Sequence, residues 1–383
     1  MDARTGWAQA RQRAYDAAVP LPPRLRPLDD CGGTVLAAPL VARTSLPPYD
    51  VSAMDGYAVA GPAPWRLVGE VLAGVTWDVP LARGTAIGIA TGARLPDGTS
   101  AVLQVEHAQV HDGLLSGEVE TGRHVRRAGE ECTQGELLLP AGSAVTAAVL
   151  GLAAACGHDA LAVHPRPRVA AVVTGDELLR DGLPREGRVR DALGPQLPLL
   201  VAAQGADLVE RVHLRDDEAL LRKAVEAAEA DVVVVTGATS VGPADHTRAV
   251  LEELDAVLLV DGVACRPGHP QLLARLPDDR FVVGLPGNPL AALVAALTVL
   301  GPLLARLGGR APQSGRGLLA ERVRAVPGDT RLVPVRLDGL SAHPVRHTGS
   351  GMLRGAALAD ALAVVPPGPD LEPGAEVELL PLP

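Results

Sequence analysis

Residues 231–237 read Asp-Val-Val-Val-Val-Thr-Gly, the most strand-like run in the chain. A strand made uniformly of Val buries both of its faces, which is typical of a parallel sheet covered by helices on either side. A second run of this kind, VAAVV, occupies residues 169–173, and FVVG at 281–284 begins another strand. Helical segments separate these runs, so residues 164–307 are predicted to form a doubly wound α/β domain.

The rest of the chain shows three other patterns. Residues 1–40 and 134–163 contain helical segments, and the first of these regions also contains a Pro-rich stretch. Residues 41–133 contain short β-like runs broken by Gly, which predicts a β-rich domain. Residues 308–383 alternate between apolar and polar positions, which predicts a small all-β domain.

Composition excludes several classes of protein. The 383 residues carry 35 basic and 45 acidic side chains, and without a basic stripe a nucleic acid is not an expected partner. The uncharged apolar stretch 289–305 is too short to span a bilayer and contains Gly301-Pro302, so we expect a buried helix and no membrane association. The polar N-terminus and four scattered cysteines favour a reducing cytoplasm, without a zinc site or a disulfide framework.

Three loops that follow predicted strands are candidates for a ligand site. They span 174–177, 236–245 and 284–289, and their Gly and hydroxyl residues allow backbone N–H groups to approach a phosphate. Acidic residues beside such loops favour Mg²⁺, which binds carboxylate and phosphate oxygens. The second loop lacks Gly-Lys-Ser/Thr, which excludes a P-loop NTPase. Each loop alone is as consistent with a structural turn.

Seven motifs in this order resemble the MoeA / gephyrin E-domain family of molybdopterin molybdenumtransferases over essentially the whole chain. They are SAMDGYAV (52–59), TGARLPDG (91–98), VRRAGEE (125–131), TGDELL (174–179), SVGPAD (240–245), RPGHP (266–270) and LPGNP (285–289). The resemblance implies a MogA-like α/β domain, a β-rich domain, and a small C-terminal β-barrel domain. It also implies an elongated helical and linker domain that joins residues 1–40 and 134–163.

The resemblance also implies an enzyme of molybdenum cofactor synthesis. Such an enzyme uses Mg²⁺ to hydrolyse adenylylated molybdopterin, inserts molybdenum from molybdate and releases AMP. It implies a homodimer whose active site joins the α/β domain of one copy to the β-rich domain of the other. The adenylyltransferase of the same pathway is a candidate partner.

Site residues follow from the motif positions. The resemblance implies catalytic roles for Asp55, Thr91, Glu131, Glu177, Asp216 and Asp245. Candidate metal ligands are Glu177, Asp191, Asp216 and Asp245. Candidate residues for binding the pterin nucleotide and molybdate are Thr174, Gly175, Asp176, Gly237, Thr239, Ser240, Gly242, Arg266, His269, Pro286, Gly287, Asn288, Pro289, Arg346 and Ser350. Asp217 is instead predicted to lie at the N-terminus of a helix, where a negative charge interacts favourably with the helix dipole.

Several positions depart from the family pattern and keep two alternatives open. The family usually has Asp, Asn, Gly and Lys at the positions that hold Glu131, Leu193, Ala238 and His269 in this chain. One alternative function is therefore that of a paralogue that binds the nucleotide or a partner protein without turnover. A weaker alternative is molybdopterin adenylyltransferase, which the α/β domain also resembles. Asn288 is the one asparagine of the chain, which marks its amide as a candidate contact.

Overall fold

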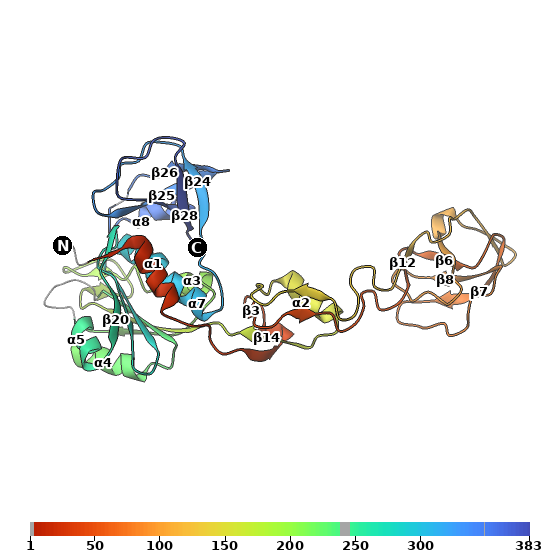
Figure 1. The fold of residues 1–383 in the computed structure, drawn as a ribbon, viewed down its shortest axis with the longest axis horizontal. Coiled ribbons are helices and arrows are strands. Elements are labelled where there is room, and N and C mark those ends of the chain that lie inside the picture. Colours follow the sequence, from red (N-terminus) through yellow and green to blue (C-terminus); the bar gives the residue numbers. More distant parts are fainter. Residues whose placement is uncertain (1–3, 238–245, 348) are drawn as a thin grey trace. The chain divides into compact units, whose positions relative to one another are not determined.

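The computed structural model describes residues 4–237, 246–347 and 349–383, and the chain divides into two compact units (Figure 1). The first unit comprises Met1–Arg24, Gly33–Val35 and His164–Pro383. The second comprises Leu25–Gly32 and Leu36–Val163. Each unit is described separately below.

A six-stranded sheet forms the centre of the first unit, in the order β18-β15-β19-β23-β22-β20. The strands are β15 (Arg168–Thr174), β18 (Asp207–Leu214), β19 (Val232–Thr236), β20 (Val257–Asp261), β22 (Leu272–Arg275) and β23 (Phe281–Leu285). Strands β18, β15, β19 and β23 are parallel neighbours. All four valines of β19 are fully buried, which confirms the predicted strand covered on both faces.

Two strands of this sheet were not predicted. Strands β20 and β22 pair antiparallel with each other, and β22 pairs antiparallel with β23. The sheet is therefore mixed at this edge, and β23, the last of its strands in chain order, lies inside it. Val257 and Leu258 of the edge strand are more than 40% exposed, so β20 lacks the pattern of a buried strand.

Helices cover both faces of the sheet. One face packs against α1 (Trp7–Asp16), α3 (Leu197–Ala203), α6 (Pro289–Ala295), the π-helical turn η3 (Ala296–Leu300) and α7 (Gly301–Leu307). The other face packs against α4 (Glu218–Ala227) and α5 (Thr247–Glu253). Asp217 caps α4, since its carboxylate accepts the Leu220 N–H at 2.9 Å, as expected for a helix N-terminal charge. These layers confirm the doubly wound α/β fold.

The long apolar stretch after residue 288 is a core helix. Among the described residues, Pro289–Leu307 is the one helical stretch long and apolar enough to cross a membrane, and 94% of its apolar window is buried inside the protein. This agrees with the predicted buried helix, but the expectation that the stretch is too short to span a bilayer was wrong, because the helix continues to Leu307.

Helix α1 packs differently from the predicted grouping of residues 1–40 with 134–163. It lies against α7 and η3 of the α/β domain (Figure 1). Trp7, Ala10 and Ala14 form its buried face, and the Trp7 indole N–H donates to the Thr298 hydroxyl at 3.1 Å. A bulky Trp followed by two alanines fits closely onto the apolar α6–α7 surface, so tertiary packing determines the position of this helix.

The C-terminal region forms a closed five-stranded barrel, as predicted. Its strands are β24 (Gly315–Leu319), β25 (Thr330–Asp338), β26 (Ser341–Pro344), β27 (Ala361–Val365) and β28 (Glu376–Pro381). Pairing of β25 with β27 closes the barrel. Two further strands, β1 (Thr5–Gly6) and β21 (Val263–Arg266), extend this sheet in the order β1-β21-β25. The sheet thus connects the N-terminus, the α/β domain and the barrel.

The second unit contains the β-rich domain. Its six-stranded sheet has the order β10-β11-β7-β8-β6-β9. The strands are β6 (Gly56–Val59), β7 (Trp65–Val71), β8 (Thr85–Ile89), β9 (Ala101–Gln104), β10 (Gln109–His111) and β11 (Leu114–Ser116).

The same unit holds the helical and linker region. A three-stranded sheet of β2 (Arg24–Pro27), β14 (Ala160–His164) and β3 (Val35–Leu36) accompanies α2 (Ala147–Ala155). Thr146 caps the start of α2, and Gly157 with φ +87° follows its end, which agrees with the predicted helix and its terminating glycine. The boundaries between the predicted domains stay predictions.

The packing of α1 generates a stability prediction. Trp7→Ala removes a 5% exposed indole from the core of the first unit and is expected to lower its free energy of unfolding by about 3–5 kcal/mol. Trp7→Phe retains most of the volume and loses the hydrogen bond to Thr298, so its cost is expected to be about 1 kcal/mol. Urea unfolding followed by circular dichroism measures both, and equal losses for the two variants would contradict this packing.

Candidate functional site

The carboxyl ends of β15, β19 and β23 bring the three predicted loops together. These strands are neighbours in the sheet, so the loops that follow them emerge at one edge. Gly237 has φ +86°, and a Cβ there would lie 2.6 Å from the Thr174 carbonyl oxygen. A Cβ on Gly287 would lie 3.6 Å from the Gly237 Cα. The loops therefore approach one another at a distance that glycine permits.

Side chains at the end of β15 connect to the end of β18. The Asp176 backbone N–H donates to Asp216 Oδ2 at 3.2 Å, and Arg215 Nε lies 3.4 Å from Asp176 Oδ1. Glu177 is exposed beside them. The Thr174 hydroxyl is buried and donates to the Thr236 carbonyl at 2.8 Å, so it joins two strand ends. The acids predicted at these strand ends thus lie close to one another.

A pocket of about 270 Å³ lies beside these acids. Its lining includes Gly175 and Asp176, together with three arginines, Arg180, Arg188 and Arg215. His213 also lines it. We call this the strand-end pocket; its cationic side chains suit an anionic group such as a phosphate. His213 was missed in the sequence because a single His within a strand carries no ligand spacing.

Asp191 has a structural environment that differs from the predicted role as a metal ligand. Its Oδ1 accepts the N–H groups of Leu193 at 2.9 Å and Gly194 at 2.8 Å, and its Oδ2 lies 2.9 Å from His213 Nε2. Burial opposes ionisation of this carboxyl, but the hydrogen bonds from Gly194, His213 and Leu193 outweigh it and lower its pKa. Both oxygens have partners within the protein, and the role of Asp191 as a metal ligand stays a prediction.

The other candidate metal ligands are only partly described. Within residues 4–237, 246–347 and 349–383, no group of three or more His, Cys, Asp or Glu side chains is arranged to hold a metal ion. Asp245 lies outside the described residues, as do Thr239, Ser240 and Gly242. Glu177 and Asp216 remain available at the strand ends. Two carboxylates fit Mg²⁺ that arrives with a phosphate, because Mg²⁺ often binds through one or two carboxylates plus substrate phosphates.

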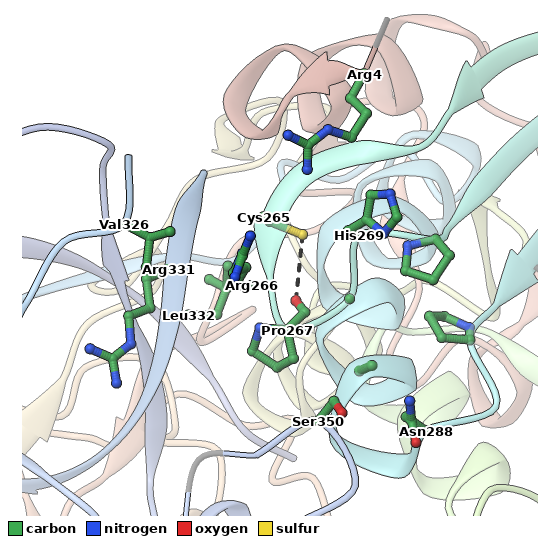
Figure 2. Close-up of a pocket in the computed structure, with 14 residues that line it drawn as sticks. Arg4, Cys265, Arg266, Pro267, His269, Asn288, Val326, Arg331, Leu332 and Ser350 are labelled. Carbon is green, nitrogen blue, oxygen red and sulfur yellow. Dashed lines mark hydrogen bonds between the residues drawn. The ribbon is translucent and has the colours of Figure 1, made fainter. Parts of the chain in front are cut away.

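A larger pocket of about 500 Å³ lies between the 265–270 loop, the start of α6 and the barrel (Figure 2). We call it the arginine pocket. Five predicted binding residues line it, namely Arg266, His269, Pro286, Asn288 and Ser350. Arg346 is exposed and, among the described residues, is not part of this lining. The structure therefore unites residues that are up to 84 positions apart in the sequence.

Asn288 stands at the N-cap position of α6, where an asparagine side chain commonly accepts a backbone hydrogen bond. Within the described residues it makes no such bond, and Pro289 occupies the first helical position. The amide of the one asparagine in the chain is exposed at the arginine pocket. It can therefore donate to and accept from a ligand, as the sequence suggested.

The 265–270 loop owes its shape to two residues. Gly268 has φ +101°, and a Cβ there would lie 3.1 Å from the Ala291 carbonyl oxygen of α6. The fully buried Gln271 donates through Nε2 to the Gly268 carbonyl at 2.7 Å and to Cys265 Sγ at 3.4 Å. Burial raises the pKa of the Cys265 thiol to about 12, with a contribution from nearby Asp329, so the thiol stays protonated. The loop is thereby held against α6 with Arg266 and His269 at the pocket.

Two further arginines of this pocket were missed in the sequence. Arg4 lies next to β1, and Arg331 lies on β25 of the barrel (Figure 2). In a chain whose basic residues are almost all arginine, an additional Arg carries no signal. The pairing of β1 and β25 with β21 brings them together, and sequence alone does not reveal such non-local pairing.

Asp55 and Thr91 belong to the second unit and contact each other. Asp55 Oδ1 accepts the Thr91 N–H at 2.6 Å and the Thr91 hydroxyl at 2.8 Å. These hydrogen bonds, the backbone one first, lower the pKa of the Asp55 carboxyl, so this exposed group is ionised at neutral pH. Glu131 is exposed in the same unit, and its backbone N–H donates to the Leu46 carbonyl at 2.9 Å. The structure pairs two of the predicted catalytic residues.

Family models account for most of the chain. Residues 5–157 match the MoeA N-terminal region (domain I and II), and residues 170–306 match a probable molybdopterin binding domain. Residues 316–382 match the MoeA C-terminal region (domain IV). The order of the three matches is that of the domains described above.

Individual relatives agree with these matches. A molybdopterin molybdenumtransferase of Haemophilus influenzae is 32% identical over 74% of this chain and 72% of its own length. Molybdopterin molybdenumtransferase 2 of Mycobacterium tuberculosis is 35% identical over 73% of both chains. The crystal structure of a MoeA protein from Pyrococcus horikoshii superposes with a TM-score of 0.78 at 29% identity, covering 99% of both chains. The chain therefore belongs to the MoeA family, a family of transferase enzymes of molybdenum cofactor biosynthesis.

Proposed function

We propose that this protein is a molybdopterin molybdenumtransferase that inserts molybdenum from molybdate into adenylylated molybdopterin, with Mg²⁺-dependent release of AMP. The observation that carries the proposal is the arginine pocket. Arg4, Arg266 and Arg331 line it together with the exposed Asn288, and the described lining contains no carboxylate. Molybdate is a small dianion, and arginines with an amide are suitable donors to its oxygens. The names of the relatives support the same reaction.

The strand-end pocket suits the phosphate groups of the pterin nucleotide. Arg180, Arg188 and Arg215 provide cationic donors, and the glycine-containing loops provide backbone N–H groups. Bound Mg²⁺ would be held by Glu177 and Asp216 and would offset the charge that develops on the phosphate during hydrolysis. Asp191 acts through His213, which it orients toward the pocket, and Gly175 lets the chain turn beside it.

We further propose a homodimer in which Asp55 and Thr91 of a second copy complete the site. The Thr91 hydroxyl and N–H hold the Asp55 carboxylate ionised and in one orientation, although it is exposed to solvent. Such preorganisation of an exposed acid is expected for a group that acts on a ligand from another surface.

One observation favours a second function. His269 lines the arginine pocket where the family usually has Lys, and an imidazole lacks the fixed charge with which a lysine ammonium group attracts an anion. A paralogue that binds the nucleotide without turnover is therefore the alternative. The adenylyltransferase function receives no comparable support, because the matches extend over the β-rich and barrel domains as well.

Loss of the strand-end carboxylate tests the reaction. With adenylylated molybdopterin, molybdate and Mg²⁺, the wild-type protein is expected to release AMP, and Asp216→Asn is expected to slow release by roughly 10- to 100-fold. The neighbouring Asp217→Asn is the matched control, because asparagine also caps helices and α4 remains intact. Chromatographic quantification of AMP measures all three proteins; equal rates for the two variants would contradict the role of Asp216.

Mixing two inactive variants tests the shared site. Asp55→Asn removes the acid of the second unit, and Asp216→Asn removes the acid of the first unit. If each site combines both units from different copies, a mixture after subunit exchange is expected to regain about one quarter of wild-type activity through heterodimers with one intact site. Light scattering establishes the dimer mass, and a monomer, or dimers that exchange without regaining activity, would refute the shared site.

Restoring the family residue at position 269 distinguishes turnover from binding alone. His269→Lys adds a fixed positive charge to the pocket and is expected to tighten molybdate binding severalfold. If the protein is an active enzyme, AMP release by the wild type is already measurable. If the wild-type protein binds the nucleotide tightly but releases no AMP, and the His269→Lys variant does release AMP, the result favours the non-catalytic paralogue.

A further inference from the structure

Asp329 is a buried carboxylate next to the arginine pocket and is 1% exposed. It precedes β25, at a turn in which its N–H donates to the Val326 carbonyl. Its Oδ1 lies 2.9 Å from Arg4 Nη1, and its Oδ2 accepts Arg266 Nε at 2.7 Å. The two arginines come from the N-terminal segment and from β21. One carboxylate thus connects three segments of the chain that are far apart in sequence.

The contact to Arg266 uses Nε, which lies at the side of the guanidinium group. The side chain is 67% exposed even so, and it lines the pocket with its outer nitrogens available to a ligand. An arginine can bind a carboxylate through one edge of its fork and an oxyanion through the other. A lysine has one ammonium group and lacks this geometry. Arg266 can therefore bind Asp329 and an oxyanion at the same time, which depends on the shape of its guanidinium group and not on its charge alone.

Arg331 completes the arrangement. It lies opposite Arg266 in the register of β21 and β25, and its Nη1 donates to the Arg324 carbonyl at 3.0 Å. Three guanidinium groups around one pocket repel one another unless a negative charge lies among them. Asp329 provides that charge from the buried side, where it faces Arg4 and Arg266 but is not part of the lining.

From this geometry we propose that Asp329 is a positioning residue, which orients Arg4 and Arg266 so that the pocket binds a tetrahedral oxyanion of the molybdate class. The inference rests on the proposed function of the arginine pocket and adds to it a residue that does not touch the ligand. It also links binding to the β1-β21-β25 pairing, because the arginines that receive the anion are tied to the strand junction.

The two roles that Asp329 could have, as a negative charge or as a positioning residue, predict opposite effects on anion binding when its carboxylate is removed. If Asp329 acted only through its charge, Asp329→Asn would tighten anion binding, because a negative group near the pocket disappears. If it positions the arginines, the same change weakens binding, since the asparagine amide cannot hold two guanidinium groups. The sign of the change therefore identifies the role.

Calorimetric titration of the full-length protein with sodium molybdate is the experiment. Asp329→Asn is expected to weaken molybdate affinity about tenfold or more and to reduce the preference for molybdate over sulfate. In the AMP-release assay the KM for molybdate rises and the rate at saturating molybdate is retained, which a general loss of structure would not produce. Asp278→Asn is the matched control; it loses an ion pair in which Arg280 Nε lies 2.7 Å from Asp278 Oδ2, neither residue lines the arginine pocket, and it is expected to retain wild-type affinity.

Asp329→Glu keeps the charge and moves it by one methylene, so it tests position even if the asparagine variant does not fold. It is expected to weaken molybdate binding, with thermal unfolding close to that of the wild type. Unchanged or tighter binding in either folded variant overturns the inference while leaving the proposed function intact. Absence of molybdate binding by the wild-type protein overturns the proposed role of the pocket, and the inference with it.

Discussion

Burial of both faces of the β19 valines is the constraint on which the site depends. A strand without any polar side chain between Val232 and Val235 must be covered on both faces, and the helices that cover it also hold its parallel neighbours β15 and β23 in one sheet. The loops after these strands then emerge at one edge. Thr174, Gly237 and Gly287 approach one another there because their strands are held in register by the core. Hydrophobic packing thus places polar residues that do not themselves specify the fold.

The sequence predicted the parts of the structure that depend on local pattern. The valine runs, the capped helix after Asp217 and the alternating barrel strands β25, β27 and β28 were recognisable because each carries its own periodicity. The partly exposed edge strand β20 and the short strand β21 lack such a pattern. The position of α1 could not be predicted either, since it depends on the surface formed by residues 289–307.

For the same reason, some residues of the candidate site were predicted from the sequence and others were not. Residues within motifs, such as Arg266, His269 and Asn288, are close in sequence to the loops that hold them, and the structure brings them to one pocket. Arg4 and Arg331 reach it through strand pairing between distant segments. Asp191 is a residue whose surroundings the sequence did not reveal. Its position in a loop suggested a metal ligand, whereas in the structure each of its carboxylate oxygens has a partner among Leu193, Gly194 and His213.

The pairing of β1 with β21 has a consequence for synthesis on the ribosome. Thr5 pairs with Val263, and Trp7 packs against Thr298, so Thr5 and Trp7 leave the ribosome long before the residues that they contact have been made. The second unit closes largely within Leu36–Val163 and can fold while the N-terminal segment still lacks its sheet and its helical surface. Completion of the arginine pocket is therefore a late event during synthesis, since Asp329 is made more than 300 residues after its partner Arg4.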